Sequence, residues 1–250
     1  SDLELTELEF GGEYYLVENY QQFKANYEQL QRPVVGIALS GGGARAIVNF
    51  GVIKALKEEG IPIDFMSGTS MGAIVSTFYG SGLNTEQIEE IVTTTSFGRL
   101  INLSLGGSGS LIETKKLNLF LEEIAPNNRL ENFVIPTALL SFELGAGKKY
   151  LTTRGRISEV IQSSYSIPLY FPIESRGDKY FMDAGILEAT PAKAVSALGA
   201  DFVIATTSFA DQSYENFNSA AASINRFLNI LQENYSQQII DNYADFLIKI

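Results

Sequence analysis

Hydrophobic and polar positions settle into a regular succession of elements from about residue 34. Residues 34–39 (Val-Val-Gly-Ile-Ala-Leu) form a short apolar run between a proline and a Ser-Gly-Gly-Gly loop, which is typical of a buried parallel strand. Residues 44–59 carry apolar side chains at helical spacing and end at a glycine, and residues 61–66 and 73–81 predict the next strand and helix. This order of elements predicts an α/β domain with a largely parallel central sheet.

The remainder of the chain continues the alternation. We expect residues 84–132 to be mostly helical, with a loop at the Gly/Ser-rich stretch 104–110. Further strands are predicted over 133–144, 149–153, 180–182, 201–205 and 244–248, helices over 157–163, 191–198 and 224–243, and a rigid extended stretch over 166–172. The last strand, Ala-Asp-Phe-Leu-Ile, echoes the Ala-Asp-Phe-Val-Ile of residues 200–204, and we therefore interpret it as a strand rather than as continued helix.

The first 31 residues differ from the rest in pattern and in charge. Residues 3–10 partly alternate between apolar and polar, a Gly-Gly pair interrupts them, and apolar residues between 20 and 30 then recur at helical spacing. Seven acids and one lysine give this stretch a net charge of −6. The sequence predicts an acidic N-terminal arm over 1–31, packed on a main domain over 32–250.

Composition limits the chemistry that the chain can perform. The 250 residues include no Cys and no His. The absence of Cys excludes disulfides, thiolate metal sites and cysteine nucleophiles, and the absence of His excludes a Ser-His-Asp triad, a histidine base and a His-ligated zinc. Acid–base chemistry therefore has to use carboxylates, Lys, Tyr or a bound cofactor. Hydrophobic residues make up 45% of the chain, enough for a large buried core.

Charge and hydropathy limit the partners. The 18 Lys and Arg residues against 29 Asp and Glu give a net charge of −11, which argues against nucleic acid and against a polybasic membrane clamp. No stretch approaches the roughly 20 continuous apolar residues of a membrane span. Residues 1–4 (Ser-Asp-Leu-Glu) do not resemble a signal peptide. Localisation is left open: cytoplasmic or peripheral if these residues are the remnant of a tag, exported if a leader has been removed.

The sharpest local motif is Gly-Thr-Ser-Met-Gly at residues 68–72, a G-x-S-x-G between a predicted strand and a predicted helix. A serine on so tight a turn projects its hydroxyl outward, and the N-terminus of the following helix offers unpaired N–H groups to an oxyanion. The pentapeptide alone also fits an ordinary turn. Its place between strand and helix makes Ser70 a candidate nucleophile and the Met71 N–H a candidate donor.

A second glycine-rich stretch, Ser-Gly-Gly-Gly-Ala-Arg-Ala at residues 40–46, allows three interpretations. It fits a dinucleotide fingerprint with Asp64 as the ribose acid, an oxyanion loop of backbone N–H groups, or a tight connection that needs glycine's freedom. A P-loop is excluded because no Gly-Lys-Ser/Thr occurs here. The oxyanion interpretation is preferred because it uses this loop and the Ser70 turn together, with Arg45 stabilising the loop or a nearby negative charge.

Asp183 ends an apolar strand and is followed by Ala and Gly, which makes it a candidate base for Ser70. An Asp in this position also favours its own turn. The absence of histidine gives the catalytic interpretation more weight. On sequence grounds alone, four other acids compete with Asp183 for this role: Asp64, Glu143, Asp178 and Asp201.

Four motifs together resemble the patatin-like phospholipase family. They are Ser-Gly-Gly-Gly-Ala-Arg at 40–45, Gly-Thr-Ser-Met-Gly at 68–72, Ser-Tyr-Ser-Ile-Pro at 164–168 and Asp-Ala-Gly at 183–185. They stand in the order seen in that family, within a stretch of similarity from about 34 to 206; the C-terminal helix and strand over 218–250 follow it. The resemblance implies a patatin-type three-layer α/β sandwich. It further implies a Ser-Asp dyad, which suits a chain without histidine.

The function that the resemblance implies is hydrolysis of carboxylic esters of lipids or phospholipids, met in solution or at a membrane surface. Ser70 would be the nucleophile and Asp183 the base. The loop of Gly41, Gly42, Gly43 and Arg45, together with Met71, would form the oxyanion hole. No metal and no cofactor are implied.

The chain departs from the family's pattern at three positions. Ala46 stands where the family commonly has Gly, Asn49 where it has His, and Ala184 where it has Gly. None of these differences removes a catalytic group. Two other classes of function remain as alternatives: a catalytically silent lipid-binding module and a nucleotide-dependent oxidoreductase.

Overall fold

A computed structural model describes residues 5–94, 111–168, 171–208 and 219–250, and within these ranges the strands form one ten-stranded sheet. The strands are β1 (Leu5–Phe10), β2 (Glu13–Glu18), β3 (Val35–Leu39), β4 (Phe65–Thr69), β5 (Thr137–Glu143), β6 (Lys148–Thr152), β7 (Glu174–Arg176), β8 (Lys179–Asp183), β9 (Phe202–Thr207) and β10 (Phe246–Lys249). The order across the sheet is β1-β2-β6-β5-β4-β3-β9-β10, and β8 pairs with both β5 and β7.

The centre of the sheet is parallel. β5, β4, β3, β9 and β10 run in one direction, as the βα alternation of the sequence predicts. Antiparallel pairs join β6 and β8 to β5, and β7 to β8. The chain therefore has an α/β fold with a mixed, largely parallel central sheet, which confirms the predicted fold class.

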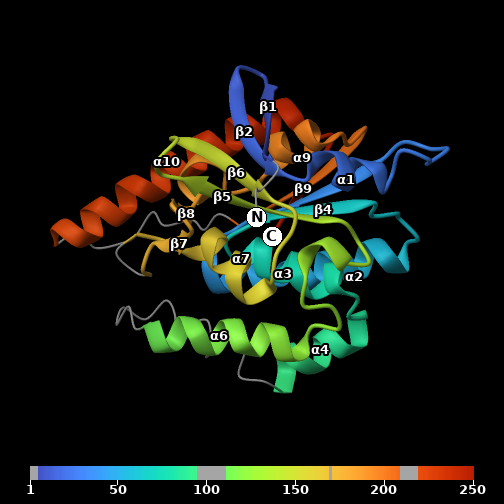
Figure 1. The fold of residues 1–250 in the computed structure, drawn as a ribbon, viewed down its shortest axis with the longest axis horizontal. Coiled ribbons are helices and arrows are strands. Elements are labelled where there is room, and N and C mark those ends of the chain that lie inside the picture. The colour runs from blue at the N-terminus through green and yellow to red at the C-terminus, as the bar shows by residue number, and fades with distance from the viewer. Residues whose placement is uncertain (1–4, 95–110, 169–170, 209–218) are drawn as a thin grey trace.

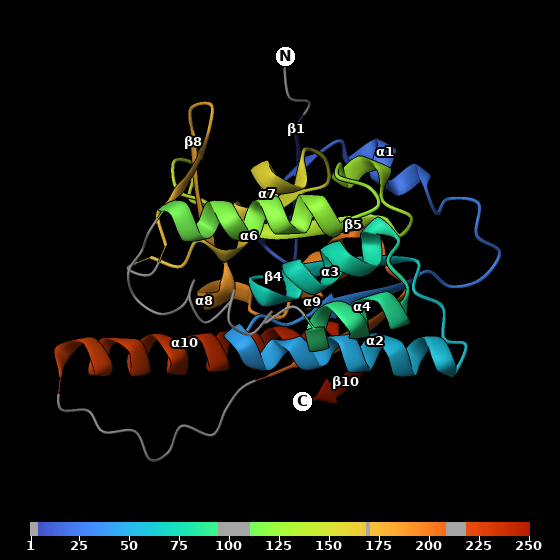
Figure 2. The ribbon, with the colours of Figure 1, turned by 90° about the horizontal axis from the view of Figure 1, so that it is seen from below.

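Helices cover both faces of the sheet (Figures 1 and 2). The helical elements are α1 (Tyr20–Ala25), the 3₁₀ helix η1 (Gly43–Val48), α2 (Asn49–Glu58), α3 (Met71–Ser81), α4 (Thr85–Thr94), α6 (Leu111–Ile124), the 3₁₀ helix η2 (Leu130–Asn132), α7 (Ile157–Tyr165), α8 (Gly185–Glu188), α9 (Ala192–Leu198) and α10 (Ala220–Tyr243). In Figure 1, α2, α3, α4, α6 and α7 lie on one side of the sheet, and α9 and α10 on the other. The result is three layers.

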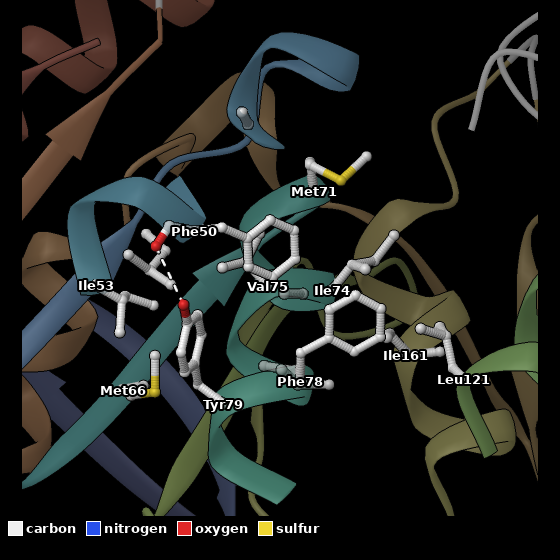
Figure 3. Close-up of a cluster of buried hydrophobic side chains, with 14 of the residues drawn as sticks. Phe50, Ile53, Met66, Met71, Ile74, Val75, Phe78, Tyr79, Leu121 and Ile161 are labelled. Carbon is white, nitrogen blue, oxygen red and sulfur yellow. Dashed lines mark hydrogen bonds between the residues drawn. The ribbon is translucent and has the colours of Figure 1, made fainter. Parts of the chain in front are cut away.

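Two apolar cores follow from this layering. Along β3, Ile37 and Leu39 face the core under α2 and α3, while Ala38 between them faces the core under α9 and α10. Alternate side chains of a strand point to opposite faces, so a strand covered on both sides reads as a continuous apolar run. Figure 3 shows the first core, where Phe78 and Tyr79 of α3 pack with side chains of α2 and β4.

The second predicted strand is displaced. The sequence predicts it over residues 61–66, but β4 begins at Phe65 and runs to Thr69. The Ile61 N–H donates to the carbonyl of Leu56 in α2 (2.9 Å), and Pro62 has no N–H to donate to a ladder. Residues 61–64 therefore carry the chain from α2 to the amino end of β4, in the middle of the sheet.

The helix predicted over residues 44–59 is also built differently at its start. Residues Gly43–Val48 form a 3₁₀ helix, and the α-helix α2 begins only at Asn49. The remaining predicted strands and helices occur close to their expected places, including the C-terminal strand, which pairs in parallel with β9. The predicted loop at 104–110 and residues 169–170 of the predicted extended stretch lie outside the described residues.

The N-terminal residues extend the sheet. β1 and β2 form a hairpin across Gly11 and Gly12, and β2 then pairs in parallel with β6. We call residues 5–18 the N-terminal hairpin. Tyr15 and Val17 from β2 are fully buried in the core under α9 and α10. The boundary between the predicted arm and the main domain stays a prediction, but the hairpin shares its sheet and its core with the rest.

Candidate active site

Ser70 sits on the turn between β4 and α3 in a strained backbone conformation. Its φ is 55° and its ψ is −122°, and among the described non-glycine residues only Asn19 also has a positive φ. A non-glycine residue in such a conformation costs of order 1–3 kcal/mol and persists only where its surroundings enforce it. The Ser70 side chain is presented at the N-terminus of α3, where the first backbone N–H groups have no partner within the helix.

Two glycines enforce the tight turn. A Cβ on Gly68 would lie less than 3 Å from the backbone of Gly72, and a Cβ on Gly72 would lie less than 3 Å from the carbonyl of Leu39. Real side chains do not approach backbone this closely. The two glycines of the G-x-S-x-G motif therefore let α3 start directly against the ends of β3 and β4, with Ser70 at the point of closest approach.

The register of β5 explains why Asp183 lies beside Ser70. In β5, Leu140 pairs with Thr69, the last residue of β4, and the next residue, Ser141, pairs with Asp183, the last residue of β8. β4 runs parallel to β5 and β8 runs antiparallel to it. The carboxyl ends of these two strands therefore meet end to end beside β5, which brings together two residues 113 positions apart.

The motif at residues 164–168 holds this meeting point. The Ser70 N–H donates to both the carbonyl oxygen (3.1 Å) and the hydroxyl (3.2 Å) of Ser164, whose hydroxyl donates to the Leu140 carbonyl (2.6 Å). The Asp183 N–H donates to the carbonyl of Ser166 (3.0 Å). One short segment at the end of α7 thus fixes the backbone of Ser70 and of Asp183, a role that the sequence did not assign to it.

Burial sets the electrostatics of Asp183. Its side chain is 6% exposed, and burial raises the pKa of its carboxyl from 3.8 to about 6. A hydrogen bond with the Ser70 side chain and the N–H of Gly185, which donates to Oδ1 at 2.6 Å, both act to lower that pKa. Asp183 is therefore ionised at neutral pH, in contact with Ser70, and readily accepts a proton.

The structure places the four competing acids elsewhere. Asp64 accepts hydrogen bonds from Arg32 and from the Val35 N–H, and Asp201 accepts one from the Val34 N–H, all at the amino ends of strands. The Glu143 carboxylate accepts the N–H groups of the turn that follows β5. Asp178 is exposed in the turn between β7 and β8. Of the five candidate acids, Asp183 alone contacts Ser70.

The three glycines after β3 are placed differently from one another. The Gly41 N–H donates to the carbonyl of Ala189 (2.9 Å), so it is not free to bind an oxyanion, and a Cβ on Gly41 would lie about 3.0 Å from Cβ of Ser70. Gly42 has a φ of 135° and Gly43 a φ of 61°. Among the described residues, the N–H groups of Gly42 and Gly43 have no hydrogen-bond acceptor.

Met71 and Arg45 complete the predicted set. The Met71 side chain is buried in the core of Figure 3, and its N–H, at the start of α3, has no acceptor in the described part of the chain. Arg45 is exposed in η1, two residues after Gly43. The structure thus brings Ser70 and Asp183 into contact and places Gly41 against Ser70, while Arg45 is exposed in η1.

Comparisons with known proteins identify the family of the chain. The sequence model of the patatin-like phospholipase family matches residues 37–196. The chain belongs to the patatin-like phospholipase family. An uncharacterized NTE family protein of Mycobacterium tuberculosis is 31% identical over 177 residues, which cover 70% of this chain and 49% of that protein. The chain therefore spans about half the length of this mycobacterial relative.

More distant patatin-like relatives carry functional names. Neuropathy target esterase sws of Drosophila melanogaster is 27% identical over 179 residues, covering 68% of this chain and 12% of that protein. A lysophospholipase of Phaeosphaeria nodorum is 26% identical over 192 residues, covering 73% and 13%. Among solved structures, VipD from Legionella pneumophila aligns with 88% of this chain and 55% of its own, at 15% identity and a TM-score of 0.46.

Several residues that shape this patatin-like site were missed or left without a role by the sequence analysis. Ser208 donates to the Gly41 carbonyl (2.5 Å) and fills the space where a Cβ on Gly42 would lie. The Thr69 hydroxyl donates to the Glu188 carbonyl (3.0 Å). The family motif at 164–168 was a usable signal for Ser164, whereas nothing local marks Ser208 or Glu188.

Metal and membrane searches cover only the part of the chain that the structure describes. Within it, no group of three or more acidic side chains is arranged to hold a metal ion. No helix in these ranges combines the length and the hydropathy needed to cross a membrane.

Proposed function

We propose that this patatin-like chain is a lipid acyl hydrolase that cleaves carboxylic esters through a serine acyl-enzyme. The observation that carries the proposal is the contact between the strained Ser70 and the buried Asp183. The N–H groups of Gly42, Gly43 and Met71, which have no acceptor in the described part of the chain, add candidate oxyanion donors. Nucleophile, base and oxyanion donors are the three parts that acyl transfer requires.

Acylation begins at the Ser70 hydroxyl. Asp183 accepts its proton as Oγ attacks the ester carbonyl, and the carbonyl oxygen becomes an oxyanion. The N–H groups of Gly42, Gly43 and Met71 stabilise that oxyanion. Asp183 then passes the proton to the leaving alcohol, and Ser70 retains the acyl group.

Deacylation repeats these roles with water. Asp183 accepts a proton from the water that attacks the acyl-enzyme and returns a proton to Ser70 Oγ as the fatty acid leaves. A carboxylate is a weak base for a serine hydroxyl. The raised pKa of Asp183, about 6, brings it closer to the pKa of the serine hydroxyl. Preorganised oxyanion donors, worth roughly 3–4 kcal/mol each in known sites, contribute much of the remaining stabilisation of the transition state.

The substrate class comes from the family and from its relatives. The family's name describes phospholipases, and two of the relatives are called an esterase and a lysophospholipase. We therefore propose a lipid or phospholipid ester as the substrate. The net charge of −11 favours neutral or zwitterionic lipid over an anionic surface.

The nucleotide-dependent oxidoreductase is the weaker alternative. A dinucleotide site would need an acid at the carboxyl end of the strand that follows the glycine loop, on the ribose. Asp64 lies at the amino end of β4 instead, with its carboxylate bound to Arg32 and to the Val35 N–H. The silent lipid-binding module has no specific observation in its favour.

The experiment that tests the proposal is hydrolysis of short-chain p-nitrophenyl esters in excess chelator. The dyad and the backbone donors need no cation, so we expect turnover in chelator, followed by fatty-acid release from one or more members of a phospholipid and lysophospholipid panel. A chain that hydrolyses no ester, or that does so only after calcium is restored, would contradict the proposed mechanism. Stabilisation by NAD without hydrolysis would instead favour the oxidoreductase.

A further inference from the structure

Glu188 is a fully buried carboxylate with three donors. Its Oε2 accepts hydrogen bonds from the Tyr15 hydroxyl (2.9 Å) and from the Lys149 ammonium (2.6 Å), and its Oε1 accepts the Ala194 N–H (2.9 Å). Tyr15 belongs to the N-terminal hairpin, Lys149 to β6 and Ala194 to α9. One side chain thus connects α8 to three separate elements.

The cluster continues toward the hairpin. Lys149 also pairs with Glu13 at the start of β2, and Lys193 pairs with Glu13 from α9 (3.3 Å). Burial acts against the charge of Lys149, but Glu188 and Glu13 outweigh it and raise the pKa of its ammonium. Burial, followed by the Glu188 charge, raises the pKa of Tyr15 and keeps its hydroxyl protonated as a donor. Lys149 and Tyr15 are therefore both held protonated, as donors to Glu188.

The segment that Glu188 anchors, residues 183–190, contacts both loops of the candidate active site. At its start, the Gly185 N–H binds the Asp183 carboxylate. At its end, the Glu188 carbonyl accepts the Thr69 hydroxyl (3.0 Å), and the Ala189 carbonyl accepts the Gly41 N–H (2.9 Å). This segment therefore contains the base, and it bonds to the residue before the nucleophile and to the first residue of the glycine loop.

The segment cannot hold its own conformation. Its only helix, α8, is four residues long, and a helix of one turn is unfavourable without support from its surroundings. Part of the support comes from α10, where the Ser236 hydroxyl accepts the Ala189 N–H (3.1 Å). The fully buried Glu188 carboxylate supplies a second anchor, to β2, β6 and α9.

We infer that Glu188 is a positioning residue, and that the N-terminal hairpin, which lies outside the family match at 37–196, supports the catalytic centre through Tyr15 and Glu13. Glu188 does not touch the reacting atoms. It fixes the backbone that holds Asp183, Thr69 and Gly41 in place. The inference deepens the proposed function and rests on it.

Two variants of the intact chain test the inference. Glu188→Gln keeps the size of the side chain and removes its charge, and Tyr15→Phe removes one donor while keeping the ring. We expect Glu188→Gln to lower kcat for a p-nitrophenyl ester at least about tenfold, with KM changed less than about twofold, because small displacements of reacting groups cost rate rather than binding. Tyr15→Phe should lower kcat about threefold by the same route.

Glu18→Gln is the matched control. Glu18 is also a buried acid of the hairpin strand β2, and it accepts a hydrogen bond from Tyr150 of β6 (2.8 Å), but no hydrogen bond joins it to residues 183–190. We expect it to leave kcat within about twofold of the wild type. An equal loss of kcat in Glu18→Gln would mean that removing any buried carboxylate near the hairpin lowers activity, and would overturn the inference.

Hydrogen–deuterium exchange separates failure of the inference from failure of the proposed function. We expect faster exchange over residues 183–190 in Glu188→Gln and Tyr15→Phe than in the wild type and in Glu18→Gln. Unchanged exchange together with unchanged kcat would overturn the inference. A wild type that hydrolyses no ester would overturn the proposed function, while the exchange data still decide whether Glu188 anchors the segment. If Glu188→Gln does not fold, Tyr15→Phe decides by the same two measurements.

Discussion

The two glycine-rich connections that follow β3 and β4 occupy equivalent places in the fold, but one presents a side chain and the other presents backbone N–H groups. β3 and β4 are paired and parallel, and each leads at its carboxyl end into a tight helical turn. After β4, the glycines allow a tight turn in which Ser70, with its strained backbone, presents its side chain. After β3, Gly42 and Gly43 take positive φ values, and their backbone N–H groups have no acceptor among the described residues.

In the proposed mechanism, neighbouring strand ends supply different parts of one reaction. A nucleophile has to be a side chain, and it needs a partner base, which the register of β5 supplies in Asp183. Oxyanion donors can be backbone, and they need space, which only residues without a Cβ provide. Because Cβ of Ser70 lies close to the position that a Cβ on Gly41 would occupy, the two connections are in direct contact.

The largest expected effect comes from removing the side-chain half of this pair. Ser70→Ala should lower hydrolysis by about 10⁴-fold or more, as loss of a catalytic nucleophile does elsewhere, with little change in Tm. Ser70→Gly should be equally inactive and more stable than Ser70→Ala by about 1 kcal/mol, because glycine adopts a φ of 55° without strain. Initial rates and thermal denaturation measure both. Substantial turnover in Ser70→Ala would place the nucleophile elsewhere.

Asp183→Asn tests the base that completes the same half. Asparagine keeps the shape and can still accept the Gly185 N–H, but it cannot accept the serine proton. We expect a loss of several orders of magnitude in kcat, close to that of Ser70→Ala, because members of one catalytic unit do not act additively. Asp64→Asn and Asp201→Asn serve as controls and should stay active once folding is confirmed. A folded but inactive Asp64→Asn would contradict the assignment.

Gly42→Ala tests the backbone half. The φ of Gly42 is 135°, and the new Cβ would collide with the Ser208 hydroxyl. The loop therefore has to shift, and its N–H groups would no longer point at the oxyanion. Loss of one oxyanion donor typically costs about 10²–10³ in kcat. Gly51→Ala, in α2 with open space around it, is the matched control and should keep full activity while gaining about 0.5–1 kcal/mol of stability. Equal activity in the two variants would remove the loop from the mechanism.

The smallest effect is a pH dependence of kcat/KM that comes from the Asp183 carboxyl. Since Asp183 has to be ionised to act as a base, kcat/KM should fall about tenfold per pH unit below an apparent pKa of about 6. Burial raises the pKa of Asp183 from 3.8 to about 6 in the folded chain. As pH rises from 4 to above 6, the carboxyl ionises in the core, and the free energy of unfolding therefore falls by about 3 kcal/mol.

Asp183→Asn also provides the stability test of that pKa. Because the variant never carries the buried charge, it should be more stable than the wild type at pH 8, and the difference should disappear near pH 4. Urea denaturation at the two pH values measures the change. A variant that is less stable than the wild type at pH 8 would mean that hydrogen bonds to the ionised carboxylate outweigh its burial.

The sequence predicted the parts of this site that local pattern encodes. Residues 68–72 carry strand, turn and helix signals in a row, so the Ser70 turn is visible without a structure. β4 was misplaced because the apolar residues that precede it resemble a strand, although Pro62 has no N–H for a ladder. The meeting of Ser70 with Asp183 depends on the pairing of Ser141 with Asp183, and no local pattern specifies such a register. The resemblance to the family, rather than spacing, singled out Asp183 from five acids.

Buried polar groups were the least predictable feature. Glu188 reads as an ordinary acid beside a small helix, and no element was predicted over the residues of β2 that include the buried Tyr15. Their burial depends on the parallel pairing of β2 with β6, which joins residues more than 130 positions apart. Hydropathy predicts an exposed Glu, whereas Lys149 and Tyr15 make burial of this one tolerable.

Labelling with a fluorophosphonate probe, followed by peptide mapping with mass spectrometry, tests the central claim most directly, because the probe reacts only with an activated serine. The account predicts a single adduct on Ser70 in the wild type. It predicts that Asp183→Asn labels more slowly by orders of magnitude while Asp201→Asn labels at the wild-type rate. An adduct on another residue, or equal labelling of Ser70 in Asp183→Asn, would contradict the account.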